Sequence, residues 1–197
     1  MAGTSGDLDM LKTQIGNLDI YADELEHLDQ WEGPADRRER AHKIRRESAP
    51  MFFHLLVGLL RDALIQGLAN ILDKPFTFGR DNLTLEYIIQ HHTVPTIQTE
   101  CMQQLSTIRA SAVYSDLTRA RNKIISHSDY ATISNYPAMT SKDFPNLTLK
   151  NLQMLIKDIM EIISRMTGQP PINFIVQDWQ GVECLFKFLE QKKAEIV

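Results

Sequence analysis

The fold of this 197-residue chain is decided by residues 51–73, which read MFFHLLVGLLRDALIQGLANILD. Apolar residues occupy most faces of the helix that this stretch would form, and such a helix is typical of the centre of a bundle. Pro50 precedes it as a helix start, and Pro75 follows its end. Arg61 and Asp62 interrupt the run, whereas a membrane span needs about 20 mostly apolar residues. We therefore predict a buried helix and no membrane span.

Helical periodicity continues on both sides of this stretch. Residues 1–32 are acidic and carry apolar residues at helical spacing, which predicts an amphipathic helix. Further helical segments are expected at 36–47, from 83, from 97 to about 127, from 147 and from 178. Residues 172–176 look strand-like but are too few to define a sheet. We predict an all-α bundle of about five or six helices. It forms a single domain over 1–197, with the bundle core at 48–195 and the acidic helix 1–32 as an appendage.

Composition narrows the classes of protein. The chain is 43% hydrophobic and 23% charged, as in ordinary globular proteins. Its net charge of −4 argues against a protein coated in positive charge, although a local basic site is still compatible with it. Cys101 and Cys184 fit neither a disulfide framework nor a metal-ligand spacing. We expect a cytoplasmic protein with reduced thiols and no metal cofactor.

A charge-dense segment occupies residues 36–47, with six basic and three acidic side chains. We interpret it as a solvated helix face with charge pairs at spacings of three and four. The alternative is a strip that contacts phosphates. The acidic residues 1–32 are a candidate cover for a basic groove, in the same chain or in a second copy.

The sequence Asn-Leu-Thr-Leu occurs twice, beginning at Asn82 and at Asn146. Both copies are formal glycosylation acceptors. The chain starts without a secretory signal pattern, so we interpret the two copies as helix starts capped by Asn82 and Asn146.

One stretch of polar residues suggests a functional site, residues 119–129, which read RARNKIISHSD. An arginine is followed directly by a polar residue, Asn122, and five residues separate Arg121 from His127. This stretch resembles the signature of the HEPN superfamily, which is an arginine, four to six residues and then a histidine. Arg37 and His42 also fit this bare spacing, but they lie in a charged segment without an apolar helix around it. The stretch is most similar to the AbiU-like branch, which is associated with phage abortive infection. Three features carry this similarity: the tripeptide Arg-Asn-Lys before His-Ser-Asp, the upstream apolar helix and the first Asn-Leu-Thr-Leu.

The resemblance implies metal-independent cleavage of RNA by its own 2′-hydroxyl. His127 would be the catalytic acid or base, since imidazole titrates near neutral pH. Arg121 would be the catalytic cation beside the phosphate, which a guanidinium fork matches. Asn122, Lys123 and Arg119 are candidate substrate-binding residues. Asp129 is a candidate for fixing the tautomer of His127.

Helix geometry limits how these residues can meet. At 100° per residue, Arg121 and His127 lie about 120° apart, whereas Arg119, Lys123 and His127 share one face. Three solutions stay open: the helix ends or bends near Ser126, Arg121 reaches around, or a second subunit completes the site. The resemblance favours a homodimer, with paired motifs in one positive groove.

Two other functions stay open from the sequence. The first is a non-catalytic HEPN-like module that binds a nucleotide, an RNA or a protein such as an antitoxin or a nucleotidyltransferase. The second is a structural protein in which Arg121 and Asn122 pair with local carboxylates and His127 with Asp129 closes a helix end. A cation-rich last helical turn is favoured by the helix dipole in any case.

Overall fold

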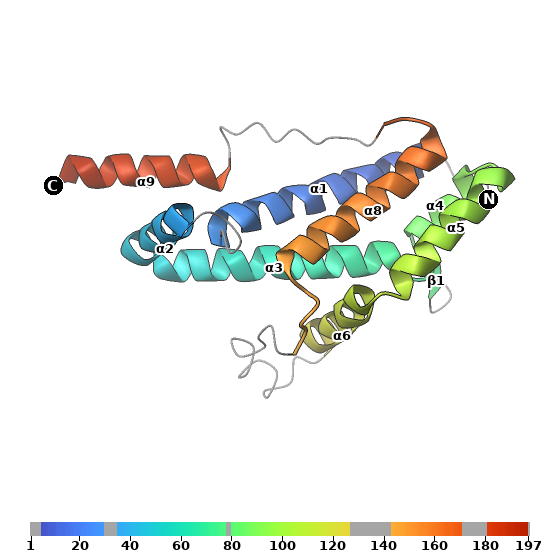
Figure 1. Cartoon of the computed structure of the whole chain (residues 1–197), viewed down its shortest axis with the longest axis horizontal. Coiled ribbons are helices and arrows are strands. Elements are labelled where there is room, and N and C mark those ends of the chain that lie inside the picture. The colour runs from blue at the N-terminus through green and yellow to red at the C-terminus, as the bar shows by residue number, and fades with distance from the viewer. Residues whose placement is uncertain (1–4, 30–34, 78–79, 127–142, 171–180, 197) are drawn as a thin grey trace. The chain divides into compact units, whose positions relative to one another are not determined.

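The structure is a computed structural model, and it describes residues 5–29, 35–77, 80–126, 143–170 and 181–196. These residues form an all-α protein, as expected (Figure 1). The described ranges contain eight helices and one hairpin of two-residue strands. The count exceeds five or six partly because the segment 97–127 divides in two at Ala110 and Ser111. The strand-like residues 172–176 lie outside the described ranges.

Contacts between Cα atoms divide the chain into two compact units. The first contains residues Met1–Leu18 and Ile65–Asn173, and the second contains Asp19–Leu64 and Phe174–Val197. Helices α1 (Ser5–Asp29) and α3 (Pro50–Leu72) contribute residues to both units. The prediction of one domain with an appended helix stays a prediction, because contact units do not by themselves define a folding domain.

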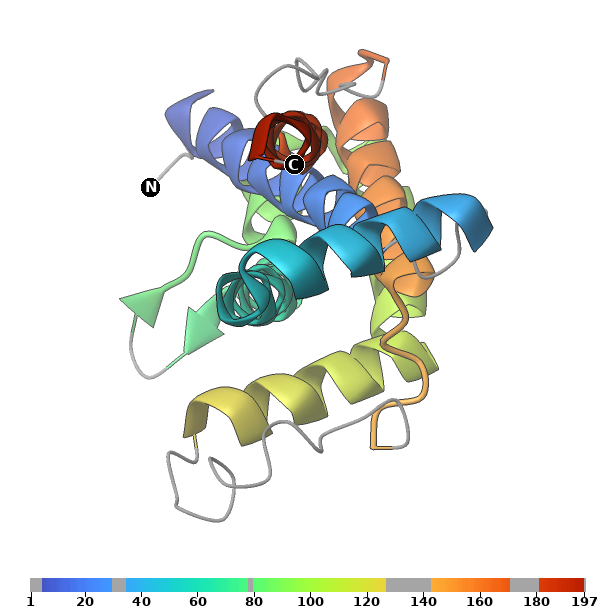
Figure 2. The ribbon, with the colours of Figure 1, turned by 90° about the vertical axis from the view of Figure 1, so that its left-hand side faces the viewer.

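The first unit is built around a pair of long helices, α5 (Pro95–Arg109) and α8 (Leu149–Thr167), which pack against each other. Helix α4 (Leu85–His92) contacts both, and α6 (Ala112–Ser126) contacts α5. After α3, strands β1 (Phe76–Thr77) and β2 (Arg80–Asp81) pair as an antiparallel hairpin, drawn as two short arrows in Figure 2. The C-terminal part of α3 buries six apolar side chains: Leu64, Ile65, Leu68, Ala69, Ile71 and Leu72.

Both Asn-Leu-Thr-Leu copies begin helices, but the capping residue is the threonine. Thr84 accepts a hydrogen bond from the backbone N–H of Tyr87, and Thr148 accepts one from that of Asn151. The predicted caps Asn82 and Asn146 are therefore wrong by two residues. Their side-chain amides donate elsewhere, that of Asn82 to the Lys74 carbonyl and that of Asn146 to a carboxylate of α6.

The second unit contains α2 (Ala35–Ser48), α9 (Val182–Ile196) and the N-terminal part of α3. Its buried cluster consists of Leu28, Ala41, Ile44, Phe53, Val182 and Phe186. The prediction that α3 is buried throughout is wrong here. More than half of each side chain is exposed in a stripe made of Met51, Phe52, Leu55 and Leu59. Four neighbouring apolar residues at helical spacing form an unusual surface for a lone chain.

Helix α3 is also long and apolar enough to cross a membrane, judged by length and composition alone. One third of its most apolar window is buried within the protein. Core helices of soluble proteins meet the same criterion, so the expectation of no membrane span stays a prediction.

Helix α1 is continuous from Ser5 to Asp29 and buries one face along its whole length. The predicted apolar face is confirmed: the buried side chains are Leu11, Ile15, Leu18, Ala22, Leu25 and Leu28. Gly67 on α3 allows a close approach to α1. A Cβ atom there would lie 2.4 Å from Leu18 Cδ2, inside van der Waals contact.

Candidate functional site

Helix α6 carries four of the six predicted site residues, and it divides them between two sides. Positions two apart on a helix are separated by about 200°, so Arg121 lies opposite Arg119 and Lys123. The helix buries Asp116, Leu117 and Ala120 between these two sides.

On one side, Arg119 and Lys123 share a face, as the spacing predicts. The guanidinium carbon of Arg119 and the ammonium nitrogen of Lys123 each lie 5.5 Å from the ring centroid of Phe144. Both are cation–π contacts, which are worth about 0.5–1 kcal/mol at exposed sites. The ring of Phe144 is itself buried. Two cationic side chains are thus brought together at one aromatic ring.

A buried carboxylate ties residues 143–146 to this side of α6. Asp116, 4% exposed, accepts hydrogen bonds from both the backbone N–H and the side-chain amide of Asn146. Its other oxygen lies 3.0 Å from Nη1 of Arg119, and Nη2 of Arg119 donates to the carbonyl of Asp143. These partners satisfy a charge that would otherwise be costly to bury.

On the other side, Arg121 is held by a residue distant in sequence. Its Nη1 lies 2.8 Å from Oδ2 of Asp73, which directly follows α3. The side chains are 22% and 35% exposed, respectively, so the pair is partly shielded from water. Nε of Arg121 is 3.4 Å from the side-chain oxygen of Asn122. Within the described residues, Nη2 of Arg121 has no hydrogen-bond partner.

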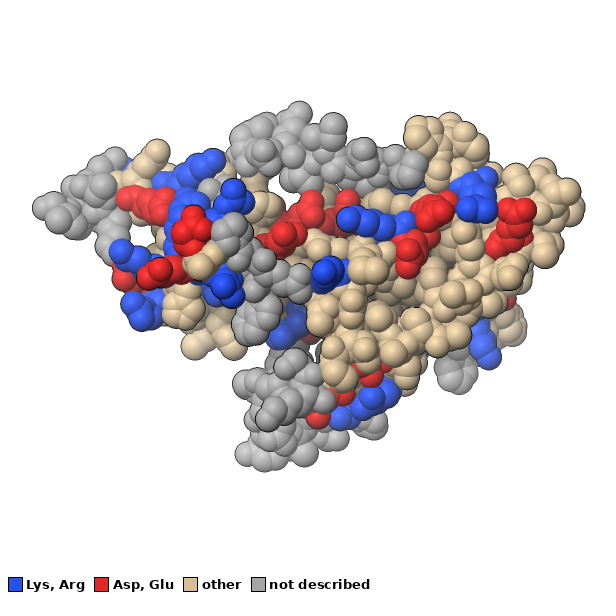
Figure 3. All heavy atoms as spheres, viewed as in Figure 1, with Lys and Arg blue, Asp and Glu red and all other residues tan. Residues whose placement is uncertain are grey.

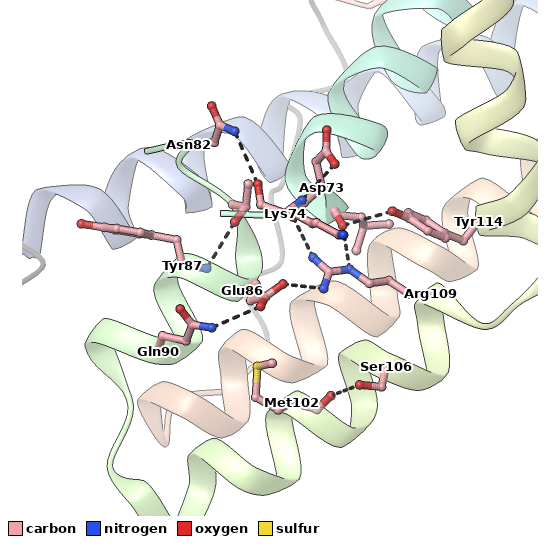
Figure 4. A network of polar contacts seen from close by, with 12 residues as sticks. Asp73, Lys74, Asn82, Glu86, Tyr87, Gln90, Met102, Ser106, Arg109 and Tyr114 are labelled. Carbon is pink, nitrogen blue, oxygen red and sulfur yellow. Dashed lines mark hydrogen bonds and ion pairs between the residues drawn. The ribbon is translucent and has the colours of Figure 1, made fainter. Parts of the chain in front are cut away.

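The end of α3 that carries Asp73 is anchored by Arg109 of α5, as Figure 4 shows. Nε of Arg109 donates to the carbonyl of Leu72 at 2.8 Å, and Nη2 donates to that of Asp73 at 2.7 Å. Nη1 of Arg109 pairs with Glu86 of α4. The last carbonyls of a helix have no partner within it, so this arginine satisfies groups that would otherwise need water.

The structure describes four of the six predicted site residues. His127 and Asp129 lie outside the described residues. Asn122 and Lys123 are exposed, and Arg121 pairs with a carboxylate that is not local. Within the described ranges, histidines, cysteines and carboxylates form no group able to hold a metal ion.

Three residues of this region were missed by sequence reasoning: Asp73, Asp116 and Phe144. Asp116 precedes Arg119 by three residues, a spacing at which helical side chains pair. It therefore had a local signal that the sequence reasoning did not use. The other two come from distant segments and left no such signal.

The charge-dense segment forms α2, and its surroundings differ from those of α6. Arg40 makes two 2.8 Å hydrogen bonds to the carboxylate of Glu190 on α9, whereas Arg37, Arg38 and His42 are exposed. Figure 3 shows basic and acidic side chains interspersed over α2 and α9. This mixed surface fits the predicted solvated face better than a strip of phosphate contacts.

Comparison with known proteins identifies one family. The sequence model of the AbiU2 family, a HEPN family, matches residues 9–168. The matched range includes α3, α6 and α1 from residue 9 onward, and it covers Asp73, Arg121 and His127. No curated protein and no solved structure matches the chain.

Proposed function

Because the chain belongs to the AbiU2 family of HEPN proteins, we propose that it is a metal-independent endoribonuclease of a phage-defence or toxin system. The observation that carries the proposal is Arg121. Its guanidinium is partly exposed, fixed at one edge by Asp73, and retains a nitrogen without a partner among the described residues. Such a group can bind a phosphate through its fork of donors.

The reaction would proceed by transfer within the RNA. The 2′-oxygen forms a bond to phosphorus, the bond from phosphorus to the 5′-oxygen breaks, and a cyclic phosphate remains. His127 would take the proton of the 2′-hydroxyl or give one to the leaving 5′-oxygen. Arg121 would stabilise the charge that builds on the phosphate oxygens. Lys123 and Arg119 would attract the neighbouring phosphates.

A nuclease assay in EDTA tests this function. Wild-type protein should cut RNA and leave cyclic phosphate ends, and His127→Ala should lose the activity. The matched control is His42→Ala on α2, because His42 also follows an arginine at the family spacing yet lies on an exposed, mixed-charge surface. Equal cleavage by wild type and His127→Ala would remove His127 from the mechanism.

We also propose that the protein is a homodimer. The exposed apolar stripe Met51, Phe52, Leu55 and Leu59 supports this, because a second copy would remove it from water. Sedimentation should give a dimer for wild type and a monomer for Leu55→Asp with Leu59→Asp. The control is Met154→Asp, which changes an exposed apolar residue outside the stripe. A monomeric wild type at micromolar concentration would contradict the dimer.

A second candidate function is a non-catalytic HEPN-like module that binds RNA or a nucleotide. The pair between Arg121 and Asp73 favours it, since the pair satisfies part of the guanidinium within the chain. RNA binding without any product would select this function. If Arg121→Ala lowered only the stability and no RNA bound, the role of Arg121 would be structural.

A further inference from the structure

The backbone at Asp73, directly after α3, is held in place by other helices. Arg109 binds the carbonyls of both Leu72 and Asp73, and Glu86 holds Arg109 in turn. Helices α5 and α4 of the first unit therefore fix the two peptide groups that flank the side chain of Asp73.

The carboxylate of Asp73 is itself oriented by two donors. Its Oδ1 accepts a hydrogen bond from the backbone N–H of Lys74 at 2.9 Å. Its Oδ2 accepts one from Nη1 of Arg121 at 2.8 Å. Since each oxygen has its own donor, the plane of the carboxylate is set, and with it the position of the guanidinium.

We propose that Asp73 is a positioning residue for Arg121, an inference that rests on the ribonuclease function proposed above. An arginine side chain has several freely rotating bonds, and holding it in one place before substrate arrives removes an entropic cost from the reaction. Asp73 occupies one edge of the guanidinium and leaves Nη2 for an RNA phosphate. The chain Glu86–Arg109–Asp73–Arg121 thus links α4, α5, the end of α3 and α6.

The direction in which removal of Asp73 changes kcat and KM distinguishes positioning from competition between Asp73 and phosphate for Arg121. A carboxylate that only competed with phosphate for Arg121 would slow the enzyme, and its removal would lower KM or raise kcat. A positioning carboxylate has the opposite effect, because its removal frees the guanidinium and lowers kcat.

The experiment is a double-mutant cycle in single-turnover RNA cleavage. Asp73→Ala should lower the rate about tenfold, and Arg121→Ala should lower it by about 10²–10³. The double variant should be no slower than Arg121→Ala alone, because Asp73 acts through Arg121. Asp73→Glu, which retains a carboxylate, should recover most of the rate.

The matched control is Glu100→Ala, which removes a carboxylate paired with Arg165 at 3.2 Å elsewhere in the first unit. It should leave the rate unchanged. Thermal melting checks that each variant folds. If Asp73→Ala does not fold, Asp73→Asn completes the cycle, because an amide has one acceptor for two donors and should also lower the rate.

Three results would overturn the inference. Asp73→Ala could cleave as fast as wild type or faster, or it could cost the same factor with and without Arg121. In both cases the ribonuclease function stands as long as Arg121→Ala lowers the rate by the expected factor. Absence of cleavage by the wild-type protein is the distinct third result, since it removes the proposed function and this inference together.

Discussion

Helices α2 and α6 each carry an arginine at the family spacing before a histidine, Arg37 before His42 and Arg121 before His127. On α2, Arg37 is exposed and forms no hydrogen bond or ion pair within the described residues. On α6, Arg121 is partly buried and fixed by a carboxylate from the end of α3. Four residues separate Arg37 from His42 and five separate Arg121 from His127, so both pairs fit the family spacing. The difference is that a carboxylate directly after α3 pairs with Arg121. A guanidinium that is fixed in this way presents its remaining donors in one geometry.

Removing Arg121 and Arg37 in separate variants should give the largest difference between the two helices. Arg121→Ala should lower RNA cleavage by at least about 10², since one stabilising donor group is worth that much in a transition state. Arg37→Ala should leave the rate within about twofold. The measurement is single-turnover cleavage of one RNA in EDTA at low salt. Similar losses in both variants would show that the two helices contribute only a general positive field.

The carboxylate Asp116 should matter more for stability than any ion pair of α2. Asp116→Ala leaves the backbone N–H of Asn146 and its side-chain amide without their acceptor, which should cost about 2 kcal/mol of unfolding free energy. Urea unfolding measures this through the midpoint at constant slope. Asp116→Asn, which keeps the shape and one acceptor oxygen, should cost less. An unchanged midpoint for Asp116→Ala would contradict the role of this clamp.

The corresponding carboxylate beside α2 should contribute little. Glu190 pairs with Arg40 in good geometry, yet its side chain is 43% exposed. Exposed pairs contribute about 0–1 kcal/mol. Glu190→Ala should therefore lower the unfolding free energy by less than about 1 kcal/mol in the same urea titration. A loss as large as that of Asp116→Ala would mean that α2 and α9 depend on this pair.

The pH dependence of this pair gives the smallest effect. Hydrogen bonds from Arg40 lower the pKa of Glu190 below its usual value, against the opposing effect of burial. A lowered pKa in the folded state stabilises the fold above the unfolded pKa of about 4.3 and loses this contribution as the pH falls through the folded pKa. The stability difference between wild type and Arg40→Ala should be a few tenths of a kcal/mol at pH 7.

That difference should disappear towards pH 3, as followed by thermal melting. Arg37→Ala serves as the control, and its difference from wild type should not follow the same course. A difference that grows on acidification would contradict the assignment.

Local sequence patterns predicted the helical class and several boundaries. Pro50 begins α3, as the sequence predicted. Helix α8 ends at Gly168 in a left-handed conformation, φ 65°, that glycine adopts at low cost. The capping residues were mistaken because asparagine and threonine are both good caps. Which of them caps depends on where the asparagine amide finds its acceptor. For Asn146 this is Asp116, thirty residues earlier.

The candidate site was predictable only in part, for a similar reason. The face shared by Arg119 and Lys123 follows from a spacing of four. The partner of Arg121 lies 48 residues away, at the end of another helix. Helical periodicity carries no information about which helix end meets which side chain, so Asp73 required the three-dimensional structure. The exposed stripe of α3 was missed because an apolar sequence does not distinguish a buried helix face from an exposed one.

Helix α1 has a practical consequence for any shortened version of this protein. The sequence suggested this helix as a cover for a basic groove, yet six of its apolar side chains are buried. Trimming the chain back to residue 33 would strip hydrophobic partners from both compact units at once. Loss of nucleic-acid binding in such a fragment would therefore reflect unfolding of the protein and not the loss of a binding surface. Charge reversal at exposed acidic residues such as Asp9 and Glu26 tests whether the helix affects RNA affinity and leaves its buried face unchanged.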